Sequence, residues 1–195
     1  MEGIGVMRAL KLALALGAVG IVATTSQSQA VTIVIGGGLA TECYATAEYG
    51  DAFTAFDICT RALSNQALSV RDRAATYVNR SVIRLRVRDF SGAIADVDQS
   101  IQRWPQLSEP YVNRGAALIN LDRPQEALAE LDKAIGMGLE KVHLAYYNRG
   151  LAKEKMNDAR GAYADYRKAL ELDPNFTLAN EQLQRFLVNG MRARS

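Results

Sequence analysis

The sequence predicts an all-α fold, a right-handed superhelical array of antiparallel helix pairs that ends in a capping helix. A block of an aromatic residue, a variable residue, Asn-Arg and a small residue occurs three times, beginning at Tyr77, Tyr111 and Tyr146, at intervals of 34 and 35 residues. From Leu39 onward the chain is rich in helix-forming residues, and its apolar residues recur at helical spacing. Helix pairs this short cannot bury their apolar faces alone, so neighbouring units must stack.

The first 30 residues have the three regions of a secretory signal peptide. Arg8 and Lys11 precede an apolar run over residues 12–23, and small residues, Ser28 and Ala30, stand three and one positions before a cleavage after Ala30. The run is shorter than the roughly 20 residues of a bilayer span. We therefore expect a periplasmic or secreted protein. The alternative is an uncleaved signal that anchors the protein in the inner membrane through residues 9–23.

Residues 31–38, Val-Thr-Ile-Val-Ile-Gly-Gly-Gly, look like the first strand and glycine turn of a dinucleotide-binding fold. That motif needs a third glycine, where this chain has Thr41, and a second strand ending in an acid, which does not follow. We interpret the segment as an apolar, glycine-rich lead-in, and we expect no cofactor.

The three repeats define units at residues 74–107, 108–142 and 143–175. Twelve residues after the small residue that ends each block stands an alanine, and four residues further stands a larger apolar residue: Ala93 and Val97, Ala127 and Leu131, Ala162 and Tyr166. Pro105 and Pro174 close two of the units. This pattern closely resembles the tetratricopeptide repeat. The resemblance implies a concave face, formed by the first helix of each unit, that binds a protein ligand.

An irregular helix pair and a linker are expected before these units, at residues 39–73. The same steps of twelve and four residues lead from Cys43 to Ala55 and Cys59, and Gly50-Asp51 marks the turn. Residues 176–195 then read as a capping helix with a polar outer face and a basic tail.

The two cysteines are expected on the two antiparallel helices of the first pair. A lone pair of cysteines in an exported protein usually forms a disulfide, so we predict a Cys43–Cys59 bridge. Two buried thiols that pack as small apolar groups are the alternative.

Composition argues against several functions. The chain has 23 basic and 21 acidic residues, and a net charge of +2 is too small to indicate binding to nucleic acid. One His and two Cys without paired spacing predict no metal site. No Ser/His/Asp, paired-carboxylate or phosphate-loop arrangement has usable spacing, so we predict no catalytic residues and no enzyme.

The predicted binding groove centres on three asparagines in the same register, Asn79, Asn113 and Asn148. In the repeat array of O-linked N-acetylglucosamine transferase, which this chain resembles here, asparagines at the equivalent register bind the backbone of an extended peptide. The remaining predicted groove residues are mostly apolar: Val78, Val82, Val112, Ala116, Tyr147 and Leu151. The alternative is that Asn-Arg-Gly is a common variant of the repeat without a binding role.

Three arginines stand where the family commonly has leucine, and each precedes an acid by sixteen residues. The pairs are Arg80 with Asp96, Arg114 with Glu130, and Arg149 with Asp165. Antiparallel packing would join each pair within its unit, so we interpret them as structural ion pairs, with ligand binding as the alternative.

These patterns together predict a non-enzymatic scaffold of the bacterial envelope that binds an extended or helical segment of a protein partner. One alternative is an accessory or regulatory subunit of an envelope enzyme, such as a peptidase or cell-wall enzyme. Another is a structural assembly factor that self-associates into a homo-oligomer. Membrane contact is expected only if the signal segment is uncleaved.

Overall fold

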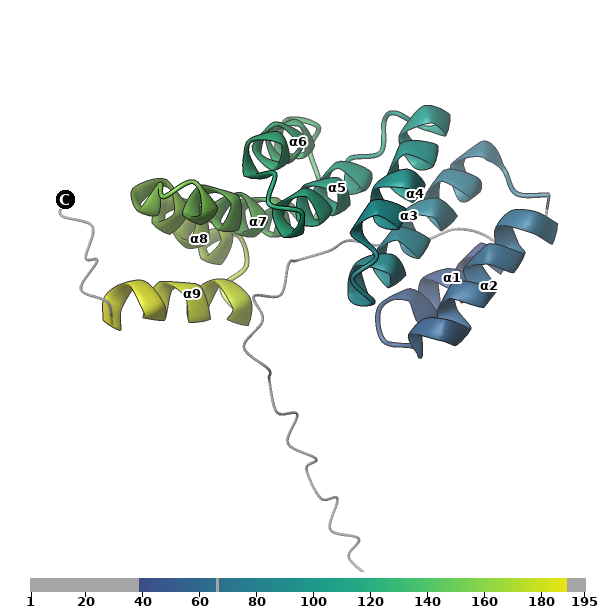
Figure 1. The fold of residues 1–195 in the computed structure, drawn as a ribbon, viewed down its shortest axis with the longest axis horizontal. Helices are drawn as coiled ribbons and strands as arrows, with labels where there is room; N and C mark the ends of the chain where they lie inside the picture. Colours follow the sequence, from purple (N-terminus) through teal and green to yellow (C-terminus); the bar gives the residue numbers. More distant parts are fainter. Residues whose placement is uncertain (1–38, 66, 189–195) are drawn as a thin grey trace, which may run out of the picture.

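A computed structural model of the chain describes residues 39–65 and 67–188, and Figure 1 shows its helices as a curved array. The described residues form nine α-helices and no strand: α1 Leu39–Ala47, α2 Ala52–Asn65, α3 Val70–Arg86, α4 Phe90–Arg103, α5 Glu109–Asn120, α6 Pro124–Gly136, α7 Val142–Lys155, α8 Ala159–Leu172 and α9 Thr177–Val188. Helices α1 to α8 pack as four consecutive pairs, and α9 packs on α8. The structure therefore confirms the all-α solenoid.

One predicted boundary is wrong. The linker that the sequence predicts up to residue 73 ends earlier, because α3 begins at Val70. Ser69 explains the early start, because its hydroxyl accepts a hydrogen bond from the backbone N–H of Asp72 at 3.0 Å and so caps the helix. The predicted signal peptide, the lead-in at residues 31–38 and the end of the basic tail lie outside the described residues.

The turn inside each regular unit has the same backbone shape. Arg88, Asp122 and Asn157 all have φ between 57° and 64°, and they recur at the intervals of the repeat. The residue after each one donates its N–H to a carbonyl five residues earlier, for example Asp89 to Arg84 at 2.8 Å. This is the Schellman ending of a helix, built here without glycine. It reverses the chain tightly and sets the two helices of each unit side by side.

The close approach of paired helices depends on matched residue sizes. A Cβ added to Gly115 would lie 2.8 Å from Leu131, and one added to Gly150 would lie 2.5 Å from a ring carbon of Tyr166. The first regular unit has Ser81 where the other two units have glycine. The residue opposite it, Val97, is smaller than Leu131 and Tyr166 and leaves room for the serine side chain. The repeated small residue is therefore required by helix contact rather than by backbone conformation.

The core is divided along the array. A continuous apolar cluster runs from α5 to α9 and contains Tyr111, Tyr147, Tyr166 and Phe186. A separate, smaller cluster in α1 and α2 contains the two cysteines, Ala47, Ala55 and Ile58, and reaches Ile83 of α3. Among the described helices, none is long and apolar enough to cross a bilayer.

Candidate functional site

The three asparagines lie on the inner side of the first helices α3, α5 and α7. Asn113 precedes Gly115 by two residues, which is about 200° around a helix, and Gly115 faces Leu131 of α6. Asn113 therefore points away from its partner helix. The same spacing separates Asn79 from Ser81 and Asn148 from Gly150. The repeat thus places one primary amide per unit on the inner face.

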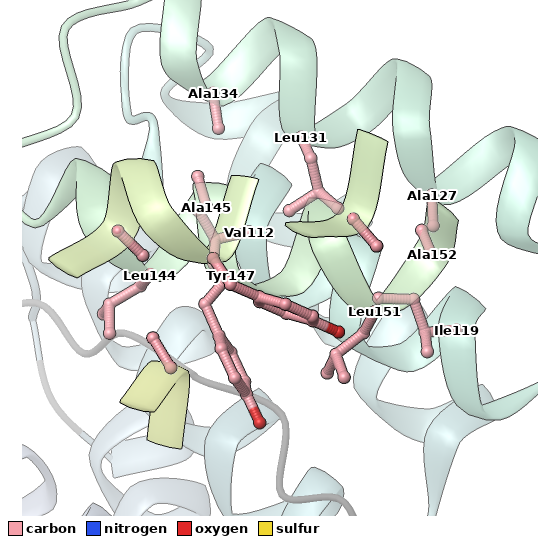
Figure 2. Close-up of a cluster of buried hydrophobic side chains, with 14 of the residues drawn as sticks. Val112, Ile119, Ala127, Leu131, Ala134, Leu144, Ala145, Tyr147, Leu151 and Ala152 are labelled. Atoms are coloured by element: carbon pink, nitrogen blue, oxygen red, sulfur yellow. The ribbon is translucent and has the colours of Figure 1, made fainter. Parts of the chain in front are cut away.

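The structure buries all nine predicted groove residues, so they do not line an open groove. The three asparagines and Val78, Val82, Val112, Ala116, Tyr147 and Leu151 are each at most 2% exposed. Figure 2 shows Val112, Tyr147 and Leu151 among the buried apolar side chains that join α5, α6 and α7. The prediction that these side chains line an exposed apolar groove is corrected accordingly: they are packed inside the array.

Each buried asparagine has a polar partner. The Nδ2 of Asn113 donates to Ser81 Oγ of the preceding unit at 3.2 Å. Ser81 Oγ in turn donates to the carbonyl of Val78 at 2.6 Å. A buried amide without a partner would destabilise the fold, and these amides avoid that cost because each has one. The three asparagines therefore form a row of partnered amides among apolar side chains.

The structure brings together all three predicted arginine–acid pairs. Arg80 binds Asp96 through two hydrogen bonds of 2.9 and 2.6 Å, and Arg149 binds Asp165 through bonds of 2.9 and 2.7 Å. Arg114 Nη2 lies 2.7 Å from Glu130 Oε2. Two hydrogen bonds to one carboxylate fix the orientation of the guanidinium group. This geometry favours a structural role over ligand binding.

Sequence reasoning missed further members of this ion-pair network. Asp96 also binds Arg84 at 2.9 Å, and Asp165 binds Lys153 at 2.8 Å, so each buried carboxylate faces two cations. Leu118 stands at the equivalent position of the middle unit, and Glu130 there is more exposed than the two aspartates. The signal was available, because Arg84 and Lys153 both follow their repeat arginine by four residues.

All three arginines also connect neighbouring helix pairs, and Arg80 Nη1 donates to Thr60 Oγ1 of α2 at 3.1 Å. Arg114 Nη1 lies 2.7 Å from Asp98 Oδ1, and Arg149 Nη1 lies 2.7 Å from Asp132 Oδ1. Asp98 and Asp132 are 34 residues apart, which is the interval of the repeat, so the sequence contains a signal for these contacts. A guanidinium that binds acids of two units links each unit to the one before it.

Aromatic residues close the array near its C-terminal end. The rings of Tyr147 and Phe176 meet edge to face with centroids 5.2 Å apart, and Tyr166 donates to Glu154 Oε2 at 2.6 Å. Arg185 of α9 binds the other oxygen of Glu154 at 2.8 Å. Burial raises the pKa of Tyr147 to about 12. Burial, together with the hydrogen bond to Glu154, also raises the pKa of Tyr166. Both tyrosines are therefore neutral structural groups at physiological pH.

The predicted disulfide is present between α1 and α2. The Sγ atoms of Cys43 and Cys59 are bonded, and their Cα atoms lie 4.8 Å apart. His143 is half-buried against Phe176, with ring centroids 5.0 Å apart, and its Nε2 lies 3.7 Å from Asp173 Oδ2. No group of three or more potential metal ligands occurs within the described residues.

Family models identify the repeat in the second half of the chain. Models of the tetratricopeptide repeat match residues 108–137 and 143–176. These two segments coincide with α5 and α6 and with α7 and α8. The unit that contains α3 and α4 has the same residue pattern and the same turn geometry.

Curated relatives match only part of their own length. The chain is 33% identical over 89 residues to a mouse FK506-binding protein-like protein, which is 45% of this chain and 25% of that protein. It is 30% identical over 122 residues to the wheat Hsp70-Hsp90 organizing protein, which is 63% of this chain and 20% of that protein. The chain thus spans a quarter or less of these relatives.

Solved structures share the fold. The TPR domain of Arabidopsis OM64 superimposes with a TM-score of 0.55 at 25% identity, over 60% of this chain and 96% of the domain. MamA gives a TM-score of 0.60 at 20% identity, over 81% of this chain and 88% of MamA. The first TPR domain of Spaghetti (RPAP3), bound to an HSP90 peptide, gives 0.56 at 20% identity, over 63% of this chain and 96% of that domain.

Proposed function

Because this chain is a tetratricopeptide repeat protein, we propose that it is a protein-binding scaffold that holds an extended segment of a partner on the inner face of α3, α5 and α7. The observation that carries the proposal is the row of Asn79, Asn113 and Asn148, one amide per unit on that face. A primary amide both donates and accepts hydrogen bonds, as a peptide group does, so such a row suits a peptide backbone.

The comparisons support a peptide as the class of ligand. RPAP3 domains of the same fold have been solved with HSP90 and HSP70 peptides. The residues that directly precede the three asparagines, Val78, Val112 and Tyr147, are apolar or aromatic and carry no charge. We propose a ligand segment that is apolar and uncharged, read mainly through its backbone.

The signal-like N-terminus supports a location in the bacterial envelope for this scaffold. Arg8 and Lys11, the apolar run over residues 12–23 and the small residues before Val31 carry that part of the proposal. The Cys43–Cys59 disulfide is consistent with it, because disulfides persist in oxidising compartments. N-terminal sequencing of the protein from an envelope fraction tests it, with Val31 expected as the first residue. A retained Met1 or Met7 would instead indicate an anchored protein.

Binding is tested by selecting peptide ligands and then measuring their affinity for a variant that lacks the three asparagines. Ten-residue peptides would be selected from a phage-displayed library against the purified chain, and calorimetry would measure their affinity. Replacing all three asparagines by Ala should weaken binding by about 0.5–1.5 kcal/mol per lost hydrogen bond, or roughly 10- to 2,000-fold if the effects add.

Arg114→Ala is the matched control. Arg114 lies next to Asn113 on α5 but faces Asp98 and Glu130 of neighbouring helices. The substitution should lower the melting temperature and leave the peptide affinity close to that of the wild type. Wild-type affinity in the folded triple asparagine variant, checked by circular dichroism, would refute the proposed binding mode.

A further inference from the structure

The junction between α8 and α9 lacks a contact that the two preceding junctions share. At those junctions an arginine of a first helix binds an aspartate of the helix before it, and the pairs are Arg114 with Asp98 and Arg149 with Asp132. One repeat interval after Asp132 and Arg149 stand Arg167 and Gln184. An arginine and a glutamine cannot form an ion pair, so the last junction is not closed in the way that the earlier ones are.

A recess of about 360 Å³ lies at this position, and both Arg167 and Gln184 line it. Its apolar lining comes from Tyr163 and Leu170 of α8 and Leu183 of α9, which pack on the core but remain partly exposed. Recesses of about 300–1,000 Å³ with an apolar lining and a few polar groups are typical of binding sites. The end of the array therefore offers a place for apolar side chains of another molecule.

The rim of this recess is basic. An adjoining hollow on α8 is lined by Arg160, Tyr163 and Arg167. Glu171 lines both hollows, but Lys168 Nζ binds its Oε2 at 3.1 Å, while Arg167 lies 4.0 Å from its Oε1. Because the charge of Glu171 is compensated by Lys168, Arg160 and Arg167 can bind carboxylates of another molecule.

The opposite end of the array has an aromatic knob, formed by Tyr49 and Phe53 on either side of the turn between α1 and α2. Each is 85% exposed, more than any other large apolar side chain among the described residues. Exposed aromatic side chains that lie together mark interaction sites, and aromatic residues are enriched among those that dominate binding energy. The knob is therefore a candidate for insertion into a recess.

The surroundings of the knob are acidic. Glu48 and Asp51 flank Tyr49, and residues 39–65 contain four acids and one arginine, a net charge of −3. Arg86 of α3 also reaches this turn, but its guanidinium is occupied there, because it donates to the carbonyls of Ala47 and Gly50 at 2.9 and 2.7 Å. The knob thus combines aromatic rings with negative charge, and the recess combines an apolar lining with positive charge.

We propose that the chain self-associates head to tail, with Tyr49 and Phe53 of one copy docked in the recess between α8 and α9 of the next. The acids beside the knob then face Arg160 and Arg167. Figure 1 shows α1 and α2 at one end of the array and α8 and α9 at the other, so every copy carries both halves of the contact. A contact between two different surfaces builds rings or open chains of copies. The inference uses neither the inner face nor its asparagines, so it is independent of the proposed function.

Charge complementarity is the reason to assign the knob to a second copy. Anionic lipid headgroups attract basic segments, so the acids beside Tyr49 and Phe53 would oppose insertion of the knob into such a surface. The recess supplies the opposite charge beside an apolar lining. Head-to-tail association would also place the inner faces of successive copies in series, which would let one partner engage several of them.

Sedimentation velocity tests the knob, using the chain isolated with its native N-terminus at about 10–200 µM, a range suited to a small interface. The wild type should form complexes whose mass rises with concentration. Phe53→Asp should weaken association at least about tenfold, because it places a charge among apolar side chains. Val70→Asp is the matched control, since Val70 is 57% exposed and also lies in the first turn of a helix. It should associate as the wild type does.

The recess is tested by reversing one charge. Arg167→Glu places a carboxylate opposite the acids of the knob and should also weaken association at least about tenfold. Lys141→Glu makes the same change of charge at an exposed position outside the recess, and it should leave association unchanged. All four substituted side chains are exposed, and circular dichroism would verify that each variant is folded.

Mixing the two interface variants distinguishes head-to-tail association from other modes. Phe53→Asp keeps its recess and Arg167→Glu keeps its knob, so each alone should be monomeric, while the mixture should form complexes of one copy of each and nothing larger. A wild type that stays monomeric at about 200 µM would overturn the proposal. So would a mixture that stays monomeric, an Arg167→Glu chain that associates as the wild type does, or an equal loss of association in Phe53→Asp and Val70→Asp.

Discussion

The first helix pair and the C-terminal half of the array are both built from packed helix pairs but have different cores. Between α5 and α9 the core contains the large side chains Tyr111, Tyr147, Tyr166 and Phe186. In α1 and α2 the buried side chains are mostly Ala and Cys, while Tyr49 and Phe53 at the turn are each 85% exposed. The pair with the small core carries the disulfide. A helix pair that buries little apolar surface can therefore be stabilised by a covalent link that restricts the unfolded chain.

The same contrast explains which features the sequence predicted. The repeat period, the helix pairs and the arginine–acid pairs follow from residue spacing, because helix geometry converts a fixed spacing into a fixed face. The disulfide was predicted because the chain has a signal-like N-terminus and only two cysteines. The packing of α1 on α2 brings the two residues close enough to bond. The turn residues Arg88, Asp122 and Asn157 escaped notice because none is glycine, although all three recur at the repeat interval.

Exposure of the site residues was less predictable. Spacing placed Asn79, Asn113 and Asn148 on the inner face, but it could not show that this face is buried. Burial depends on contacts between segments far apart in the chain, which periodicity within a helix does not report. The second cations, Arg84 and Lys153, are predictable in principle, because each lies one helical turn after its repeat arginine and so faces the same carboxylate.

Removing a large side chain from the C-terminal core should have the largest effect. Tyr166 is fully buried between α7 and α9, so Tyr166→Ala should lower the free energy of unfolding by about 3–5 kcal/mol. Urea unfolding at equilibrium measures it. Tyr49→Ala removes the same atoms from an exposed position in the N-terminal pair and should change stability by no more than about 0.5 kcal/mol. Similar losses in both variants would contradict the difference between the two cores.

Opening the disulfide should destabilise the N-terminal pair almost as strongly. The bridged cysteines are 16 residues apart, for which loop-closure entropy gives about 3 kcal/mol. In Cys43→Ala/Cys59→Ala, amide hydrogen exchange should accelerate in α1 and α2 while α5 to α9 retain their protection. Uniform acceleration along the chain, or none, would show that the two regions are not stabilised separately.

A smaller effect is expected from a carboxylate near the junction of the two regions. Asp96 is nearly inaccessible and binds Arg80 and Arg84, so Asp96→Asn leaves both cations poorly compensated and should cost about 2 kcal/mol. Asp98, on the same helix, is 53% exposed and pairs only at the surface with Arg114. Asp98→Asn should cost about 0.2–1 kcal/mol in the same urea titration. Equal costs would place the Asp96 pair among ordinary surface contacts.

The smallest expected effect is a pH dependence confined to the C-terminal region, since His143 is the chain's single histidine. Burial against Phe176 lowers the pKa of His143 below its ordinary value, outweighing the attraction of Asp173. Just below pH 6.5 the unfolded chain therefore binds more protons at this residue than the folded chain does, so stability falls as the pH is lowered through this range. His143→Phe keeps an aromatic ring beside Phe176 but cannot titrate. Urea midpoints at pH 7.5 and 5.5 should fall further in the wild type than in this variant. A smaller fall in the wild type would mean that the ion pair with Asp173 dominates, and that protonation at this end of the array stabilises it.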